Sequence, residues 1–226
     1  NAIDRHWNDG RESERYAQQD KNTDDVAFII AVLDRVSSKY NIDSQKVFVS
    51  GVSNGGFMSQ RMAMEHSRRF SAAGIVIASM GKSLEKKFAP ELPVSILYMN
   101  GTKDPLVPYA GGPIKVDLFP NLSEQLSKWR KQPPLSRGFC VSTDDAVAKW
   151  VKKNKLTKPP TVEQLPDKST DDDSRVELSL WENGDQATAV ALYKVIGGGH
   201  ALPGLSHRLP QRGVGRTNRD IVGFEV

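Results

Sequence analysis

The sequence predicts an α/β fold in one domain of 226 residues, with a mostly parallel sheet flanked by helices. Three apolar runs have the length of strands, at 46–50, 72–78 and 93–101. The second and third runs are almost continuously apolar, which is typical of parallel strands buried on both faces. Segments with helical spacing of apolar residues alternate with these runs, and that alternation favours an α/β arrangement.

The first predicted element is an amphipathic helix from Asn22 to Tyr40. The apolar residues that recur at helical spacing are Val26, Ile29, Ile30, Leu33 and Val36. Asp24 and Asp25 stand in the first turn, where carboxylates interact favourably with the positive end of the helix dipole.

A strand at 46–50 and a helix at 54–66 are predicted next, with a glycine-rich turn between them. The two buried strands at 72–78 and 93–101 follow. Residues 111–139 carry four prolines and show poor periodicity, so we expect a surface excursion or cap there.

The last part of the chain contains a predicted helix and a predicted hairpin. Ser142 and Asp145 match a capping box for a helix that runs to about Lys153. Two strand-like runs, 175–181 and 187–195, flank Asn183-Gly184, a dipeptide typical of β-hairpins.

Composition argues against several classes of function. The net charge is +4 and the pI about 9.1, but charges of both signs alternate, so we expect no nucleic-acid partner. No apolar run approaches the ~20 residues of a membrane span, and the first residues lack the apolar stretch of a signal peptide. The single cysteine, Cys140, precludes an internal disulfide, and residues 171–173 lack the ligand spacing of a metal site.

Gly51-Val52-Ser53-Asn54-Gly55 matches the GxSxG nucleophile elbow, with a predicted strand before it and a helix after it. In such a turn the serine is strained and its hydroxyl is exposed at the carboxyl end of the strand. We expect side chains at positions 51 and 55 to collide with neighbouring backbone. The helix N-terminus offers free N–H groups to an oxyanion, the N–H of Asn54 first. Ser53 is therefore the candidate nucleophile; the alternative is an ordinary glycine-rich turn.

A serine nucleophile needs a base, and His200 is the candidate among four histidines. It follows three consecutive glycines after an apolar strand, so the backbone can bring the imidazole to the edge of the sheet. His6 and His66 lie among charged residues and are expected to be solvated, while His207 lies in a loop rich in proline and arginine.

Asp104 is the candidate for the acid that orients the histidine. It follows the strand at 93–101 at its carboxyl end, where open α/β sheets gather their functional residues. The chain order Ser53, Asp104, His200 is the order found in α/β-hydrolases. Tyr109, five residues after Asp104, is a candidate pocket residue.

Several segments together resemble the polyhydroxybutyrate depolymerase and feruloyl esterase group, the bacterial form of the first carbohydrate-esterase family. The most specific are GVSNGGFMSQRMA at 51–63, NGTKDPLVPYAGG at 100–112 and GGGHALPG at 197–204. The likeness also includes WNDGR at 7–11, DDVAFI at 24–29 and YNIDSQKVFVSG at 40–51. It therefore covers nearly the whole chain.

The resemblance implies an α/β-hydrolase with Ser53 as nucleophile, Asp104 as acid and His200 as base. It also implies hydrolysis, through an acyl-enzyme and without a cofactor, of short-acyl or aryl esters of the feruloyl or acetyl type, or of hydroxyalkanoate polyesters. A secreted or periplasmic location is suggested by the resemblance alone.

The chain departs from the group at three places. Leu202 stands where members usually have tryptophan, so Leu202 is a candidate for the pocket wall that sets acyl preference. Lys155 stands where many members have a cysteine. The strands with which members begin, and their His-Gly loop with a second oxyanion donor, have no counterpart here, so we expect an α/β-hydrolase sheet truncated at its N-terminal strands.

Two other functions stay open at the level of sequence. One is a peptidase of the same fold, and the other is a catalytically weak, truncated domain that binds a polymer or a partner. The natural ester and the oligomeric state are likewise open.

Overall fold

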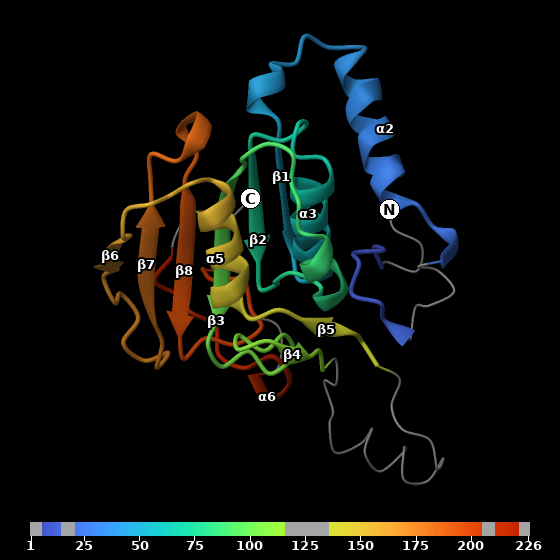
Figure 1. Cartoon of the computed structure of the whole chain (residues 1–226). Coiled ribbons are helices and arrows are strands. Elements are labelled where there is room, and N and C mark those ends of the chain that lie inside the picture. Colours follow the sequence, from blue (N-terminus) through green and yellow to red (C-terminus); the bar gives the residue numbers. More distant parts are fainter. Residues whose placement is uncertain (1–5, 15–20, 116–135, 205–210, 222–226) are drawn as a thin grey trace, which may run out of the picture.

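The computed structural model describes residues 6–14, 21–115, 136–204 and 211–221. Its centre is a sheet of six strands: β1 (Phe48–Val52), β2 (Ala72–Val76), β3 (Ser95–Gly101), β6 (Thr161–Gln164), β7 (Arg175–Trp181) and β8 (Val190–Ile196). The spatial order is β1-β2-β3-β8-β7-β6 (Figure 1). The first four strands in that order are parallel; β7 pairs antiparallel with β8, and β6 pairs antiparallel with β7. The predicted mostly parallel sheet is confirmed.

The helices that flank the sheet are α2 (Asp25–Ser37), α3 (Asn54–Glu65) and α5 (Thr143–Lys153). Figure 1 shows α3 and α5 on one face of the sheet, with α2 standing beside α3. Short elements complete the described chain: η3 (Ser44–Lys46), η4 (Lys82–Lys87), β4 (Gly112–Pro113), β5 (Phe139–Cys140), η5 (Asp185–Ala187) and α6 (Gln211–Val214). No helix in the described ranges is long and apolar enough to cross a membrane.

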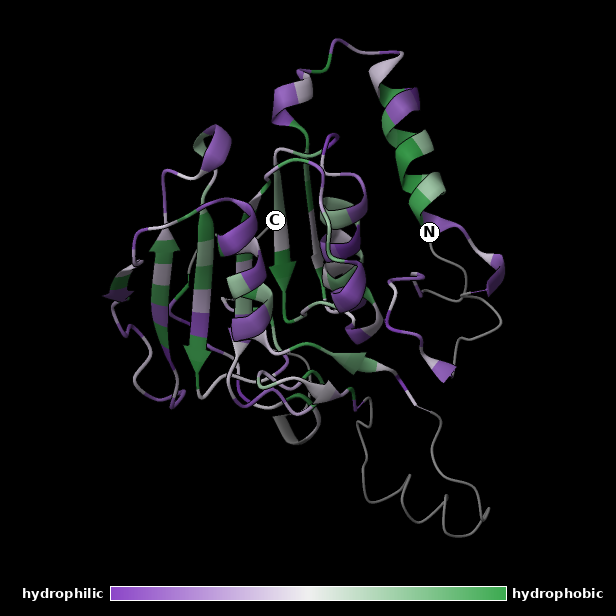
Figure 2. Ribbon diagram, viewed as in Figure 1, coloured by the Kyte–Doolittle hydropathy of each residue, from purple (hydrophilic) through white to green (hydrophobic). Residues whose placement is uncertain are grey.

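The main core lies between the sheet and the two helices in front of it, and Figure 2 shows hydrophobic residues along the central strands. A buried polar group ties three elements together within this core. Oε1 of Gln60 in α3 accepts hydrogen bonds from the hydroxyl of Tyr98 in β3 at 2.6 Å and from Nε1 of Trp150 in α5 at 3.0 Å. All three side chains are fully buried, so these bonds fix how α3 and α5 sit on the sheet.

Helix α2 is shorter than the sequence predicted. It begins after Asp24, whose side chain caps the helix by accepting the N–H of Ala27 at 2.9 Å. Carboxylates favour the N-cap because they satisfy N–H groups that have no intrahelical partner. Asp24 is therefore the N-cap rather than a residue of the first turn. The helix ends at Ser37, before Tyr40.

The predicted cap of α5 is confirmed for its Ser142 half, whereas the Asp145 carboxylate accepts from the Ser142 hydroxyl rather than from the backbone N–H that a full capping box uses. Oγ of Ser142 accepts the N–H of Asp145 at 3.0 Å and donates to the Asp145 carboxylate at 2.7 Å. The helix ends at Lys153, as predicted.

The two strands around Asn183-Gly184 pair antiparallel as predicted, but their connection is longer than a two-residue turn. It contains η5, and β8 begins only at Val190. Gly184 packs tightly against the carbonyl of Asn154, which explains the glycine without a hairpin turn. Strand β6, which pairs with the outer edge of β7, was not predicted.

The excursion predicted at 111–139 is described at its two ends only. Those ends pair as the short antiparallel strands β4 and β5, below the main sheet in Figure 1. Residues 116–135 lie outside the described residues.

Candidate active site

A sharp turn connects β1 to α3 and carries Ser53. Ser53 has a φ of 53° and a ψ of −118°, a conformation that is strained for a residue with a side chain. Its N–H donates to the carbonyl of Val76 at 2.9 Å, so the turn is anchored to the end of β2. The strand therefore presents Ser53 at its carboxyl end, directly before the first turn of α3.

The collision predicted for the glycines of this turn is confirmed at position 51 and wrong at position 55. A Cβ on Gly51 would lie 2.3 Å from the carbonyl carbon of Gly55, so position 51 accepts no side chain. A Cβ on Gly55 would meet nothing within 4 Å, and the expected collision at position 55 is wrong. The helical glycine that packing requires is Gly56, whose Cβ would lie 2.6 Å from the Cβ of Ala78.

His200 lies in the loop that follows β8, and close backbone contacts hold this loop. A Cβ on Gly101, at the end of β3, would lie 2.3 Å from the carbonyl oxygen of Gly198, so these two loops touch backbone to backbone. On the other side, the N–H of His200 donates to the carbonyl of Val214 at 2.5 Å. The three glycines thus let the loop fit between the end of β3 and the segment 213–221.

Asp104 lies in the loop that follows β3, and its carboxylate is held by the backbone of its own turn. Oδ1 accepts the N–H groups of Leu106 and Val107, both at 2.8 Å. The other oxygen, Oδ2, lies 2.7 Å from Nδ1 of His200. With its side chain almost fully buried, the carboxylate has one available orientation.

The structure brings Ser53, Asp104 and His200 together in one chain of hydrogen bonds. Nε2 of His200 lies 2.9 Å from Oγ of Ser53, and Nδ1 bonds the Asp104 carboxylate. The pairing with a carboxylate places the proton on Nδ1 and leaves Nε2 free to accept the serine proton. The imidazole is 10 % exposed, so it is shielded from water on most sides.

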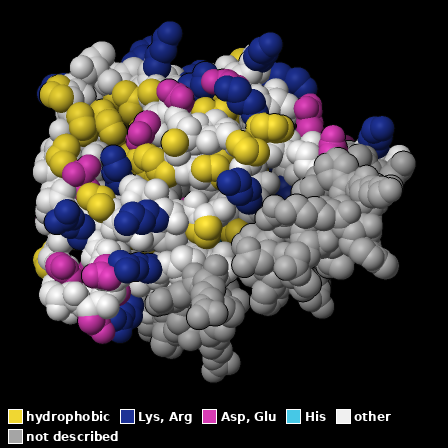
Figure 3. Space-filling view, turned by 90° about the horizontal axis from the view of Figure 1, so that it is seen from below, with side chains coloured by type: hydrophobic (Ala, Val, Ile, Leu, Met, Phe, Trp, Pro, Cys, Tyr) yellow, Lys and Arg dark blue, Asp and Glu magenta, His cyan; other side chains and the backbone are white. Residues whose placement is uncertain are grey.

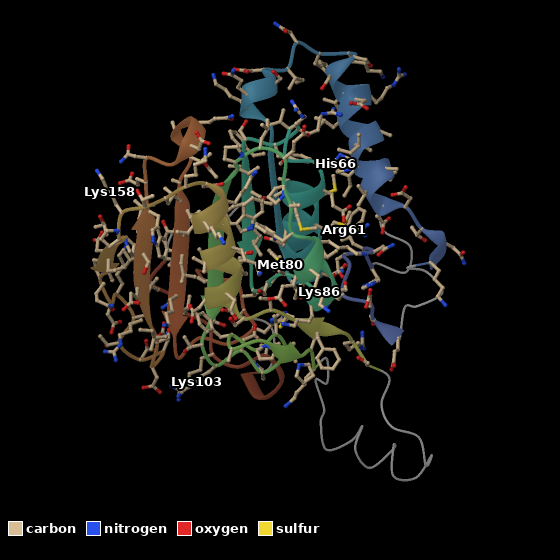
Figure 4. The ribbon with its side chains drawn as sticks, viewed as in Figure 1. Arg61, His66, Met80, Lys86, Lys103 and Lys158 are labelled. Atoms are coloured by element: carbon tan, nitrogen blue, oxygen red, sulfur yellow. The ribbon has the colours of Figure 1, made fainter. Side chains whose placement is uncertain are left out.

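The three residues gather at the edge toward which the parallel strands point. Figure 4 labels Lys103, the neighbour of Asp104, at the lower end of β3. Figure 3 views the molecule from this side and shows hydrophobic patches mixed with charged side chains of both signs. The visible described surface therefore carries Lys or Arg and Asp or Glu side chains next to one another.

The first turn of α3 also lies beside Ser53. The N–H groups of a first helical turn have no intrahelical acceptor, and the N–H of Asn54 is the first of them after the serine. The side-chain amide of Asn54 makes different contacts: it forms hydrogen bonds with Trp7 and Asp9 of the N-terminal segment. Sequence reasoning missed this contact, and the only signal for it was the WNDGR motif.

Tyr109 makes its described contacts away from Ser53. Its hydroxyl donates to the Asp144 carboxylate at the start of α5 at 2.6 Å, and Nζ of Lys194 lies 5.3 Å from the centre of its ring. Burial and the Asp144 carboxylate raise the pKa of the Tyr109 hydroxyl. These contacts give Tyr109 a structural role between its loop and α5, and none of them joins it to the three residues.

Leu202, the other candidate pocket residue, is half-buried two residues after His200. It packs against an apolar cluster at the ends of the central strands, which includes Ile77 and Met99. Ile77 directly follows Val76, whose carbonyl anchors Ser53. Leu202 therefore lies in an apolar environment that continues toward the elbow.

The remaining histidines divide as follows. His6 is buried rather than solvated, and burial lowers its pKa to about 4. His66 is the C-cap of α3, and His207 lies outside the described residues. In the described part of the chain, no group of three His, Cys, Asp or Glu side chains is placed to hold a metal ion.

Several known proteins are similar to this chain. Residues 8–88, which include the elbow, match the prolyl oligopeptidase family. "Putative esterase NocK" from Nocardia uniformis subsp. tsuyamanensis is 27% identical over 197 residues, 87% of this chain and 54% of the relative. Feruloyl esterase B from Piromyces equi is 25% identical over 182 residues, 80% of this chain and 29% of that enzyme. Feruloyl esterase C from Emericella nidulans is 28% identical over 123 residues, 54% of this chain and 44% of that enzyme.

The chain has the α/β-hydrolase fold. The parallel strands, the elbow after β1 and the family match agree on this point. These relatives are named as esterases, which agrees with the resemblance of the sequence to feruloyl esterases. The chain spans about half the length of NocK and less than half of either feruloyl esterase.

Proposed function

We propose that this protein is a serine carboxylesterase with Ser53 as nucleophile, His200 as general base and Asp104 as the acid that orients the histidine. The observation that carries the proposal is the hydrogen-bond chain from Ser53 Oγ through His200 to the Asp104 carboxylate, set on a strained strand-to-helix turn. Relatives named as esterases support it. We take residues 1–226 as a single catalytic domain.

In the first half of the reaction, His200 Nε2 takes the proton of Ser53 as Oγ attacks the ester carbonyl carbon. The carbonyl electron pair moves to oxygen, and the N–H of Asn54 donates to the oxyanion. The bond to the alcohol then breaks, and His200 gives its proton to the departing oxygen. Asp104 stabilises the imidazolium formed between these steps.

In the second half, water takes the place of the alcohol. His200 accepts a proton from water as the oxygen attacks the acyl carbon, and a second oxyanion forms at the same position. Collapse of this intermediate breaks the bond to Ser53 Oγ, which recovers its proton from His200. The products are the carboxylic acid and the free enzyme, and the cycle needs no cofactor.

We propose as substrates short-acyl or aryl esters of the feruloyl or acetyl type, or hydroxyalkanoate polyesters. Feruloyl esterases among the relatives support the aryl class. Leu202 and the excursion at 111–139 are the proposed determinants of acyl preference, because Leu202 joins the apolar cluster near the elbow. Tyr109 remains a candidate pocket residue in this proposal.

A fluorophosphonate probe tests the nucleophile directly, because it reacts with an activated serine and leaves a measurable mass. We expect one label on the wild-type protein and none on Ser53→Ala. Ser50→Ala is the matched control, since Ser50 is an exposed serine on the same strand, and it should label like the wild type. Equal labelling of Ser53→Ala, or no labelling of the wild type, would refute the proposal.

A peptidase of the same fold is the second candidate, because residues 8–88 match the prolyl oligopeptidase family. The two activities share the same nucleophile, so the probe does not separate them. Hydrolysis of a matched pair, a p-nitrophenyl ester and a p-nitroanilide with the same acyl group, does separate them. A carboxylesterase cleaves the ester only, whereas turnover of the anilide as well would favour the peptidase.

A further inference from the structure

The N-terminal clamp, defined as residues 6–14, is bonded to the residue that follows Ser53. Oδ1 of Asn54 accepts the N–H of Trp7 at 2.8 Å, and Nδ2 of Asn54 donates to the carbonyl of Trp7 at 3.1 Å. The amide side chain thus pairs with the backbone N–H and C=O of a residue 47 positions away, as a neighbouring strand would. Because its donor and its acceptor are both bonded, the Asn54 side chain has one orientation. The clamp therefore restrains the residue that follows Ser53.

Asp9 completes this connection. Its Oδ2 accepts a second hydrogen bond from Nδ2 of Asn54, at 2.5 Å. Both protons of the Asn54 amide are therefore used, and the bond to a carboxylate is of the stronger, charge-assisted kind. Asp9 thus fixes the side chain of Asn54, and the backbone N–H of Asn54 lies next to Ser53.

The Asp9 carboxylate is itself held by Arg11. Nε of Arg11 lies 2.7 Å from Oδ2, and the N–H of Arg11 donates to Oδ1 at 3.2 Å. The two side chains are only 2 % and 8 % exposed. Burying an ion pair is expensive, and a hydrophobic replacement is often as stable, so a buried pair at this position suggests a role beyond stability.

Arg11 also reaches the first turn of α3. Its guanidinium lies 4.6 Å from the ring centre of Phe57, which is fully buried one turn after Asn54. A guanidinium over an aromatic face is attracted by the ring. The ion pair therefore contacts the first turn of α3 at two points, positions 54 and 57.

The other side of the clamp is fixed to the rest of the molecule. The N–H of Asn8 donates to the Asp25 carboxylate at the start of α2 at 2.7 Å, and Nη1 of Arg61 donates to the carbonyl of Asn8 at 2.7 Å. Figure 4 shows Arg61 on the side of α3 that faces this segment. The hydroxyl of Ser83 donates to the carbonyl of Gly10. The clamp is therefore a rigid support for Asn54.

We propose that Asp9 and the side chain of Asn54 are positioning residues that hold the Asn54 N–H toward the oxyanion, with Arg11 fixing Asp9. The proposal rests on the proposed esterase function. Its physical basis is that an oxyanion donor is effective only when it is oriented before charge develops. Because Ser53 has a strained φ, the turn would relax if nothing restrained it. The clamp lies outside the helix and restrains the turn by binding the side chain of Asn54.

The test compares Asp9→Asn, Asn54→Ala and the double variant with the wild type. The measured quantities are the second-order rate of fluorophosphonate labelling of Ser53 and kcat and KM for p-nitrophenyl acetate. We expect each single variant to lower the labelling rate and kcat on the order of tenfold or more, with KM little changed, as for a loss of oxyanion stabilisation. Because Asp9 acts through Asn54, we expect the double variant to be no slower than Asn54→Ala.

Asn154→Ala is the matched control. Asn154 is fully buried and pairs with the backbone of Val94 in the same way, accepting its N–H at 3.3 Å and donating to its carbonyl at 2.7 Å. This pair ties the end of α5 to the start of β3, at the opposite end of the sheet from Ser53. We expect Asn154→Ala to lower Tm at least as much as Asn54→Ala and to leave the labelling rate unchanged.

The outcomes separate this inference from the proposed function. No labelling of the wild type would refute the esterase itself. Labelling of the wild type together with unchanged rates in Asp9→Asn and Asn54→Ala would refute the positioning role alone. Additive losses in the double variant, or an equal loss of rate in Asn154→Ala, would show that the clamp contributes general stability only.

Discussion

At the scale of single residues, the elbow depends on one glycine more than on the other. A Cβ at position 51 would lie 2.3 Å from backbone, whereas a Cβ at position 55 would lie in open space. We expect Gly51→Ala to lower the free energy of unfolding by roughly 2 kcal/mol or more, because the turn must open to admit it. Gly55→Ala should leave that free energy unchanged or raise it by up to about 1 kcal/mol, since alanine favours helix.

Urea unfolding of the two variants measures this difference, and fluorophosphonate labelling reports whether the turn still presents Ser53. We expect Gly51→Ala to lose labelling together with stability. Equal destabilisation by both substitutions would contradict the packing of this turn.

His6 gives the clamp a dependence on pH. Burial lowers its pKa from 6.5 to about 4; Arg11 and Arg137 also lower it, while Asp9 and Asp25 oppose the shift. Between these two pKa values the unfolded chain binds a proton that the folded chain does not. The free energy of unfolding therefore falls as the pH is lowered from about 6.5 toward about 4.

We expect the His6 contribution to weaken the fold on the order of 1 kcal/mol between about pH 7.5 and about pH 5, after allowance for screening by solvent. His6→Gln removes the titrating group, so the variant should lose less stability than the wild type over this range. Urea unfolding at the two pH values measures the difference. Identical pH dependence in the two proteins would contradict the role of His6.

At the scale of elements, the sequence predicted best where local pattern and burial agree. Every residue of the central strands β2 and β3 is buried or half-buried, and their apolar runs were recognisable. Strand β6 was missed because all of its residues are exposed and its side chains show no alternation. Its strand conformation comes from pairing with β7, which is information that a local pattern does not contain.

The candidate site was predictable to the extent that it follows strand ends. Ser53, Asp104 and His200 each stand just after a parallel strand, and their order along the chain matches the fold. The clamp was not predictable in this way, because the bonds of Asn54 join residues 45 and 47 positions apart. Contacts between irregular segments leave no periodic signal in sequence, and only the WNDGR motif marked this one.

The cap of α5 allows a prediction for one element. Oγ of Ser142 satisfies the N–H of Asp145, which has no partner within the helix. We expect Ser142→Ala to lower the free energy of unfolding by about 1 kcal/mol, the usual effect of removing such a cap. The labelling rate of Ser53 should stay unchanged, and a loss of labelling without a loss of stability would contradict a purely structural role for Ser142.

At the scale of the whole molecule, the position of His200 depends on the segment 213–221. This segment accepts hydrogen bonds from the backbone of Gly199 and His200. It is anchored in turn by Asp220, whose buried carboxylate accepts the N–H groups of Lys168 and Ser169 at 2.8 Å and 3.1 Å. The segment 213–221, itself anchored to residues 168 and 169, therefore holds the histidine loop.

We expect Asp220→Ala to lower the free energy of unfolding by roughly 2 kcal/mol, because the backbone N–H groups of Lys168 and Ser169 lose their hydrogen bonds to a buried carboxylate. The labelling rate of Ser53 should fall with it, since the histidine loop loses its support. Asp171→Ala is the matched control: its carboxylate forms an exposed ion pair with Arg219 on the same segment, which contributes little to stability. Equal effects of the two variants on the labelling rate would contradict the anchoring role of Asp220.

The two edges of the sheet differ in their exposed side chains, and this difference predicts how the molecule associates. Within the described chain, β1 pairs only with β2, and Phe48 on β1 is 64 % exposed. On the opposite edge, Val162 of β6 is 56 % exposed but is followed by the charged Glu163. An unpaired strand with exposed apolar residues favours edge-to-edge association, whereas a charge on an edge strand opposes it.

We therefore expect Phe48→Lys to raise the protein concentration at which light scattering detects aggregates, while Val162→Lys on the protected edge changes it little. Both substitutions replace an exposed apolar side chain with the same cation, so net charge is matched between them. The comparison isolates the edge itself. Equal protection by both would show that added charge, rather than the unpaired strand β1, controls association.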